Sequence, residues 1–325
     1  MKRVFSAVII LLLMGIIPLH AQVKDEKEGP GGNAANHAIA DPTKRPDQFK
    51  AGKSRKSESA PVLFLIGDST MKNGTGTGEG KMWGWGAFFG KFFFEDQITT
   101  ENHALGGRSS RTFITEGLWA NVIAGIQKGD YLMVQFGHND GGPLNTGRAR
   151  ASLKGIGEES QTVVMEATGK EETVYTFGHY MRQYIREAKA KGAIVIALSH
   201  TPGNRWTGNH NVIEGLTPDS VIAGLTRNLM IRCDSTYGLW TKQVAEQEGV
   251  FYFDMNDIIA RKYEAMGQEA AAAYFADGVH TLYNGAILDC IAAIEGLKTI
   301  PACSLNKYVN PEALNTVNRD KLVEE

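Results

Sequence analysis

The chain has 325 residues, 42% of them hydrophobic, and a formal net charge of -2 at pH 7. This is the composition of a globular protein. Because acidic and basic residues nearly balance, there is no excess of positive charge to bind a phosphate backbone, and we expect no nucleic-acid partner.

The N-terminus has the pattern of a secretory signal. A basic start at residues 1–3 precedes an apolar run over 8–17, and the small residue Ala21 follows it. This order predicts a signal peptide over residues 1–21 and a periplasmic or secreted mature protein. A membrane anchor is the alternative, but the run is shorter than the roughly 20 apolar residues that span a bilayer. We therefore expect no membrane contact after cleavage.

Composition divides the remaining chain into three parts. Residues 22–60 are polar and include a glycine-rich run at 29–32, so they cannot bury enough apolar surface to fold alone and are predicted to form a disordered linker. Residues 61–303 suit a single domain. Residues 304–325 are mostly polar and predict a loosely held C-terminal tail.

Within the domain, apolar runs of the kind that parallel strands bury on both faces predict five strands. They lie at 62–66, 98–103, 131–136, 194–199 and 250–254. Segments with apolar residues at helical spacing predict helices at 119–127, 180–190, 239–248 and 284–297. Strands that alternate with helices require right-handed crossovers, so we expect an α/β fold: a three-layer α/β/α sandwich with a five-stranded parallel sheet.

Residues 141–177 do not follow this alternation of strands and helices. Alternating residues at 162–165 and 172–175 flank a turn signal at 168–170, which predicts a hairpin-like insertion near the strand ends. Such a hairpin could form part of a substrate rim.

The three cysteines are Cys233, Cys290 and Cys303, an odd number for an oxidising compartment, so at most one internal pair can form. The pair we expect is Cys290 with Cys303. The alternative is three buried thiols that behave as small apolar side chains. Their spacing gives no zinc signature.

A hydroxyl residue follows the first predicted strand. Ser69 lies just beyond the carboxyl end of the run 62–66, where parallel sheets bind their ligands. Ser69 or Asp68 could instead cap the following segment, and this position alone favours the cap.

Four short blocks each follow a predicted strand or precede a predicted helix, so all of them could converge on the same edge of one sheet. They are Gly-Asp-Ser-Thr at 67–70, Gly-Gly-Arg-Ser at 106–109, Gly-His-Asn-Asp at 137–140 and Asp-Gly-Val-His at 277–280. With these blocks in this order, the chain resembles the SGNH, or GDSL-like, hydrolases, and within them the carbohydrate esterases similar to rhamnogalacturonan acetylesterase. The resemblance covers the whole domain and implies a flavodoxin-like sandwich. The threonine of the first block, where a leucine is common, weakens a lipase interpretation.

The resemblance also implies the groups that acyl transfer requires: a nucleophile, a base, an orienter of the base and donors to the oxyanion. Ser69 would attack the ester carbonyl, His280 would move the proton and Asp277 would orient the imidazole. The oxyanion donors would be the backbone N–H groups of Ser69 and Gly107 and the side-chain amide of Asn139.

Other histidines allow a metal alternative, in which His200, His210 and the pair Asp277 and His280 bind zinc. We do not favour it, because no two histidines have helical ligand spacing and the esterase interpretation already uses His280. No metal or other cofactor is expected. His138 is expected to be structural and to support the Asn139 loop.

Residues beside the blocks are candidates for substrate binding. The aromatic candidates, which could stack on sugar rings or belong to the core, are Trp83, Trp85 and Trp206. The basic candidates, which could pair with galacturonate carboxylates or form internal salt bridges, are Arg108, Arg111 and Arg205.

We therefore expect an exported serine esterase that removes O-acetyl groups from plant cell-wall polysaccharide through an acetyl-serine intermediate, with pectin (rhamnogalacturonan) favoured. The enzyme alternatives are an acetylxylan or peptidoglycan O-acetylesterase and a GDSL lipase or thioesterase. The non-enzyme alternative is a carbohydrate-binding module with a dead site. The expected partner is an acetylated polysaccharide or oligosaccharide, and the sequence leaves the oligomeric state open.

Overall fold

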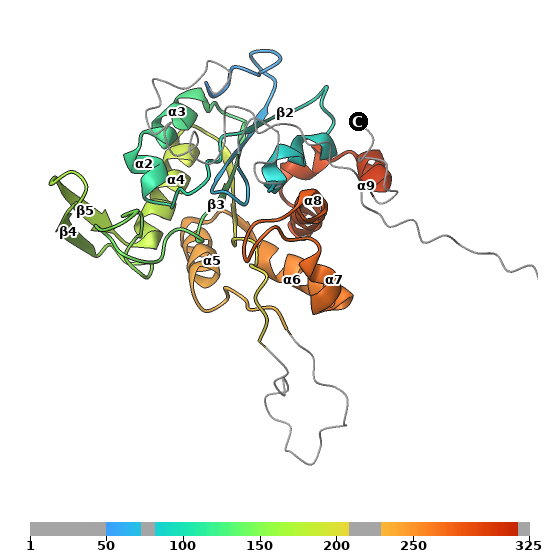
Figure 1. Cartoon of the computed structure of the whole chain (residues 1–325). Helices are drawn as coiled ribbons and strands as arrows, with labels where there is room; N and C mark the ends of the chain where they lie inside the picture. The colour runs from blue at the N-terminus through green and yellow to red at the C-terminus, as the bar shows by residue number, and fades with distance from the viewer. Residues whose placement is uncertain (1–49, 73–81, 208–228, 318–325) are drawn as a thin grey trace, which may run out of the picture.

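The computed structural model describes residues 50–72, 82–207 and 229–317 (Figure 1). The predicted signal peptide, most of the predicted linker and His210 lie outside the described residues. Within the described part of the chain, no helix is both long enough and apolar enough to cross a membrane.

Five parallel strands form the central sheet, in the order β2-β1-β3-β6-β7. They are β1 (Val62–Gly67), β2 (Thr99–Asn102), β3 (Tyr131–Gln135), β6 (Ile194–Leu198) and β7 (Phe251–Phe253). Each overlaps the strand predicted there, so the five-stranded parallel sheet is confirmed. The chain leaves β1 toward β2 on one side and later adds β3 on the other, which is the strand order of flavodoxin-like sheets.

Helices cover both faces of this sheet and complete the predicted three-layer sandwich (Figure 1). On one face lie α3 (Leu118–Gly125), α4 (Phe177–Ala190) and α5 (Tyr237–Glu248), and on the other lie α6 (Met255–Met266) and α8 (Tyr283–Lys298). Side chains of β1 alternate between the two layers, with Phe64 and Ile66 in the first core and Leu63 and Leu65 in the second. All four are fully buried, as expected for a strand covered on both faces.

Local signals set several helix ends. Thr176 accepts a hydrogen bond from His179 N at the start of α4 (3.1 Å), and Asp254 accepts one from Asp257 N at the start of α6 (3.1 Å). Gly249, with φ 62°, ends α5 in the left-handed conformation. All four predicted helices are observed.

The structure adds helices that the periodicity did not predict. Besides α6, they are α2 (Thr112–Thr115), α7 (Gln268–Ala272) and α9 (Pro311–Val317), with the 3-10 segments η4 (Trp85–Ala87), η5 (Phe89–Phe92) and η7 (Ser304–Tyr308). Most are too short to show a helical period in the sequence. Helix α6 escaped prediction because it begins at Met255, only two residues after β7 ends.

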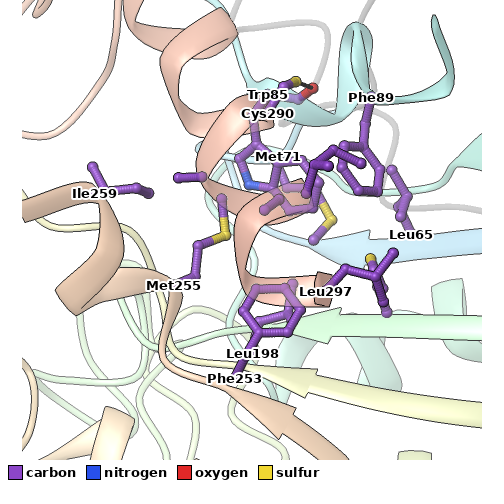
Figure 2. Close-up of a cluster of buried hydrophobic side chains, with 14 of the residues drawn as sticks. Leu65, Met71, Trp85, Phe89, Leu198, Phe253, Met255, Ile259, Cys290 and Leu297 are labelled. Carbon is purple, nitrogen blue, oxygen red and sulfur yellow. Dashed lines mark hydrogen bonds between the residues drawn. The ribbon is translucent and has the colours of Figure 1, made fainter. Parts of the chain in front are cut away.

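The core between the sheet and α8 is built around Trp85. Figure 2 shows its ring among Met71, Phe89 and Cys290, all of them fully buried. The Trp85 indole donates to Gln135 Oε1 (3.0 Å), and the Cys290 thiol donates to the Trp85 carbonyl (3.0 Å). Trp85 is therefore a core residue, and the prediction that it binds substrate is wrong.

The cysteines are all reduced. Cys233, Cys290 and Cys303 are buried and free, so the expected pairing of Cys290 with Cys303 is wrong and the alternative of three buried thiols is the one observed. Burial raises the pKa of the Cys290 thiol well above its ordinary value.

The predicted hairpin region forms a separate two-stranded antiparallel sheet, β4 (Ser160–Val164) with β5 (Glu171–Tyr175). Figure 1 shows it projecting beyond α4. Its second strand is fixed to the domain, because Val174 is fully buried and Glu172 forms an ion pair with Arg111 (3.0 Å).

The structure differs from the predicted boundary between linker and domain. Residues 50–60 contact the domain through polar groups: Arg55 makes two hydrogen bonds to the buried carboxylate of Asp130 (2.7 and 2.6 Å), and Gly52 N donates to Glu101 Oε2 (2.9 Å). This polar segment is thus held by an ion pair and hydrogen bonds, and Ala51 adds an apolar contact with the core.

The predicted tail also starts too early. Leu305 is fully buried, and Asn310 N donates to the carbonyl of Phe92 (2.9 Å). The chain beyond residue 303 is therefore part of the fold as far as these contacts reach.

Candidate active site

Loops from distant parts of the sequence meet where β1 and β3 end. In this strand order the connection after β1 runs to one side of the sheet and the connection after β3 runs to the other, and ligands of such sheets bind at that switch point. A Cβ on Gly106, after β2, would stand 3.7 Å from the Cβ of Ser69. From the other side, Asn204 N, after β6, donates to the carbonyl of Gly278 (3.1 Å), which precedes α8.

Ser69, His280 and Asp277 form a continuous hydrogen-bonded chain. His280 Nε2 lies 2.9 Å from Ser69 Oγ, and His280 Nδ1 lies 2.7 Å from Asp277 Oδ2. Because the carboxylate accepts the Nδ1 proton, Nε2 is left as the acceptor for the serine hydroxyl. These distances lie in the range of a nucleophile and base in direct hydrogen bonding.

The carboxylate of Asp277 is held in place by the backbone of the residues that follow it. Its Oδ1 accepts the N–H groups of Val279 and His280, both at 2.7 Å. Partial burial opposes ionisation of Asp277, but these backbone bonds and the bond from the His280 ring outweigh it and lower the pKa of the carboxyl. The group therefore stays charged where it faces the imidazole.

Asp68 takes the capping role that the sequence left open between Asp68 and Ser69. Its Oδ1 accepts both the backbone N–H and the hydroxyl of Thr70 (2.9 Å each), and its backbone carbonyl accepts from Lys72 N (2.8 Å). The turn that follows β1 is thus shaped by Asp68. The Ser69 hydroxyl is directed to His280 instead.

The three predicted oxyanion donors lie on the loops around Ser69. Gly107 has φ 79°, a conformation that favours glycine, and it follows Gly106, where an added Cβ would lie 3.7 Å from the Cβ of Ser69. Asn139 is buried, and its amide donates one hydrogen to the carbonyl of Arg108 (2.8 Å). A side-chain amide has two hydrogens, so this bond fixes the group and leaves the second hydrogen available.

Asp140 ties these loops together, a role that sequence reasoning missed. Its buried carboxylate accepts from Ser110 N (3.1 Å) and from Ser152 Oγ (3.2 Å), and its carbonyl accepts from Ser152 N (3.0 Å). Burial raises the pKa of Asp140 to about 6 despite these bonds. The signal that could have identified Asp140 is its position directly after Asn139, in a block where only His138 and Asn139 had predicted roles.

Two histidines lie beside the site without joining the hydrogen-bonded chain. The rings of His138 and His200 stand 4.4 Å apart, and His138 Nε2 lies 3.2 Å from Thr201 Oγ1. Burial, together with the nearby His280 and Arg205, lowers the pKa of His138 to about 4. Burial and the charge of His138 lower the pKa of His200 to about 3. Both rings are neutral near pH 7.

Two of the arginines predicted to bind substrate are internal. Arg108 is buried and pairs with Glu116 (2.9 Å). Arg111 is also buried, and besides Glu172 it donates to the carbonyls of Ala151 (2.6 Å) and Leu144 (3.1 Å). The prediction that these two contact substrate is wrong, because their neighbours in the fold use their guanidinium groups.

The other substrate candidates remain near the site. Trp83 is partly buried and pairs with Thr281, next to His280, through two hydrogen bonds of 2.9 Å. Trp206 is partly buried, packs against the core and donates to Asn204 Oδ1 (2.8 Å). Arg205 is exposed. Among the described residues, no group of three histidine, cysteine, aspartate or glutamate side chains could hold a metal ion.

The family comparison agrees with a carboxylic ester hydrolase. The model of the GDSL-like Lipase/Acylhydrolase family matches residues 65–285, a range that includes every residue of the hydrogen-bonded chain and the oxyanion set. The chain belongs to this family, and the resemblance read from the four blocks is confirmed.

Two relatives and one solved structure show in more detail what this chain is similar to. A rhamnogalacturonan acetylesterase of Emericella nidulans is 31% identical over 232 residues, covering 70% of this chain and 81% of its own length. A Bacillus subtilis protein named "Probable rhamnogalacturonan acetylesterase YesY" is 30% identical over 214 residues, covering 66% and 78%. The crystal structure of YxiM from Bacillus subtilis matches with a TM-score of 0.55 at 22% identity, a likeness of fold alone that covers 75% of this chain and 58% of that one.

Proposed function

We propose that this protein is an exported serine esterase that removes O-acetyl groups from an acetylated polysaccharide, with pectin (rhamnogalacturonan) the favoured substrate. The observation that carries the proposal is the chain from Ser69 Oγ to His280 Nε2 (2.9 Å) and from His280 Nδ1 to Asp277 (2.7 Å). Such a chain supplies a nucleophile with its base and the orienter of that base.

In the first half-reaction, Ser69 Oγ bonds to the acetyl carbon while its proton passes to His280 Nε2. The carbonyl electrons move onto oxygen, and the resulting oxyanion accepts hydrogen bonds from the N–H groups of Ser69 and Gly107 and from the Asn139 amide. The bond between carbon and the sugar oxygen then breaks, the sugar oxygen takes the proton from His280, and Ser69 is left acetylated.

In the second half-reaction, water repeats these steps. His280 Nε2 takes a proton from the water as its oxygen bonds to the acetyl carbon, and the same donors stabilise the second oxyanion. Collapse of this intermediate breaks the ester bond to Ser69, whose oxygen recovers the proton, and acetate leaves. Asp277 keeps the imidazole in one tautomer and stabilises its charged form in both half-reactions.

Three observations support a carbohydrate ester as substrate. Relatives covering most of this chain are named as rhamnogalacturonan acetylesterases. Trp83 and Trp206, both partly exposed, lie on segments joined to the loop of His280 and could stack on sugar rings. The N-terminal residues 1–21 have the pattern of an export signal, which would bring the enzyme to an extracellular or periplasmic polymer.

Release of acetate from acetylated pectin, acetylated xylan and O-acetylated peptidoglycan tests this proposal. The wild type should release acetate fastest from pectin, and S69A should release none while its circular dichroism spectrum stays unchanged. Activity retained in S69A would contradict the proposal. A preference for long-chain nitrophenyl esters over the acetate would favour the lipase or thioesterase alternative, and binding of oligosaccharide without acetate release would favour the dead binding module.

A further inference from the structure

A fourth arginine, not predicted from the sequence to bind substrate, lies beside the proposed oxyanion hole. Arg150 is partly buried, and its Nη1 donates to the carbonyl of Gly107 (3.1 Å), whose N–H is one of the proposed oxyanion donors. The charge of Asp68, the neighbour of Ser69, favours the protonated form of the Arg150 guanidinium. Arg150 thus lies beside the loop that carries a proposed oxyanion donor.

This guanidinium lacks the carboxylate partner that other partly buried arginines of the protein have. In the part of the chain that the structure describes, no carboxylate forms an ion pair with Arg150, whereas Arg55, Arg108, Arg111, Arg182 and Arg232 each have one. An arginine has five donor hydrogens, and the one bond to Gly107 leaves most of them unused by the residues described. Partial burial and the charge of Arg148 lower the pKa of Arg150, with Asp68 and Asp140 acting in the opposite direction. The group stays protonated, and an anion at this place would stabilise it.

The backbone that presents Arg150 is held in an uncommon conformation. Ala149, between Arg148 and Arg150, has φ 47°, and it is the one non-glycine residue with a positive φ among those described. The buried side chain of Arg111 donates to the carbonyls of Ala149 and Ala151 on this turn. Backbone strain kept in place by a buried side chain is a feature of ligand-binding sites. Arg111 thus positions the turn that carries the two arginines.

A further guanidinium lies on the opposite side of Ser69. Arg205 is exposed, and its Nε would lie 3.7 Å from a Cβ on Gly203, which itself abuts the carbonyl of Gly278 beside the loop of His280. No ion pair of Arg205 occurs among the described residues, and its charge contributes to the lowered pKa of His138. Positive charge therefore flanks the nucleophile on both sides, from Arg150 with Arg148 and from Arg205.

We propose that Arg150, assisted by Arg148 and Arg205, binds a carboxylate of a uronic-acid-containing oligosaccharide, so that the enzyme selects acetylated acidic sugars over neutral ones. The inference rests on the proposed function, because it assigns a specificity-determining residue to the same site. A guanidinium binds a carboxylate through two parallel hydrogen bonds, which combine charge with direction. A uronide acetylated on a ring hydroxyl carries its carboxylate on the same sugar ring as the ester, and Arg150 is bonded to Gly107, the residue whose N–H is a proposed oxyanion donor.

The test measures binding rather than turnover. Trigalacturonate and its carboxyl-reduced, neutral counterpart are titrated by calorimetry at low ionic strength into the wild type, R150Q and the control R261Q, whose arginine is exposed on α6 and paired with Asp257. The wild type and R261Q should bind the acidic sugar about 10- to 100-fold more tightly than the neutral one, and R150Q should lose most of that difference. Added salt should weaken the acidic sugar alone.

Two results would overturn the inference. Equal affinity of the wild type for the two sugars would show that the protein has no anion site. An unchanged preference of R150Q for the acidic sugar would show that Arg150 does not form that site. Hydrolysis of 4-nitrophenyl acetate, an ester without a carboxylate, measures separately what R150Q costs the oxyanion hole through the lost bond to Gly107, and this cost should be smaller than the loss of preference for the acidic sugar. A matching loss on this ester would show that Arg150 only holds Gly107. If the wild type binds acidic sugars selectively but releases no acetate, the proposed function fails while the anion site stands.

Discussion

Replacing Asp277 by asparagine should leave the fold intact and remove most of the activity. Asp277 Oδ1 accepts two backbone N–H groups, from Val279 and His280, at 2.7 Å each. An asparagine at this position must keep its carbonyl oxygen toward these two donors, because its NH2 group cannot accept them. The NH2 group would then face His280 Nδ1, where Asp277 Oδ2 now lies at 2.7 Å.

The consequence is a change of tautomer. With a donor facing it, His280 Nδ1 must act as an acceptor, so Nε2 carries the proton and can no longer take one from Ser69 at 2.9 Å. In serine hydrolases with this arrangement, a carboxylate-to-amide change costs roughly 10⁴ in kcat, which corresponds to about 5 kcal/mol in the barrier. Asp277 is partly exposed, and water can support some of the correct tautomer, so we expect a loss of about 10³ to 10⁴ here.

The assay is steady-state hydrolysis of 4-nitrophenyl acetate by D277N between pH 6 and 9. The matched control is D257N, which changes a carboxylate on α6 that pairs with Arg232 and Arg261 and should keep full activity. D277N should lose kcat with little change in KM. Retention of more than a tenth of the wild-type kcat would refute the role of Asp277 as orienter, because the backbone bonds leave the amide no second orientation.

Three further predictions concern groups around this chain. N139A should lower kcat about 10²- to 10³-fold with a smaller effect on KM, as measured with 4-nitrophenyl acetate, because it removes one oxyanion donor; an unchanged kcat would show that the Asn139 amide serves only its bond to Arg108. The folded pKa of His138 is about 4, below the value of about 6.5 in an unfolded chain, so the unfolded state binds more protons between these values. Acidification from pH 7 to 4.5 should therefore remove about 2 to 3 kcal/mol of unfolding free energy that H138Q does not lose, as measured by urea denaturation at both pH values, and parallel losses would contradict this burial. The three cysteines should react with a thiol reagent only after denaturation, since all are buried and free; labelling of the native protein would indicate that these thiols are accessible.

The sheet could be predicted because each of its strands can be recognised from a short segment of the sequence. The strands of a covered parallel sheet are near-continuous apolar runs, and β1 and β3 are fully buried along their whole length. The hairpin was predictable for a similar reason, since its alternation and turn signal lie within a few residues of each other. Helix α6 was not, because its start at Met255 is set by the cap of Asp254 so soon after β7 that no change of pattern separates the two.

The site was predictable only in part, because its residues depend on different kinds of information. Ser69, Asp277 and His280 belong to the four blocks whose order identifies the family. The arginines, in contrast, are distinguished from one another only by the residues that they contact in the folded protein. Both Arg111 and Arg150 donate to loop carbonyls near the site, yet Arg111 is buried and pairs with Glu172, whereas Arg150 is only partly buried and has no carboxylate partner among the described residues. Nothing in the sequence separates them, since burial and hydrogen bonding of an arginine are decided by residues far along the chain.

Covalent labelling of Ser69 tests the central claim most directly. An organophosphonate that forms a stable bond with activated serines should modify the wild type once, and peptide mass spectrometry should place the adduct on Ser69. The H280A variant should label at least 10²-fold more slowly, because the hydroxyl that now lies 2.9 Å from Nε2 would lose its base. An adduct on another serine, or an unmodified Ser69 in a protein that still releases acetate, would contradict the proposed mechanism.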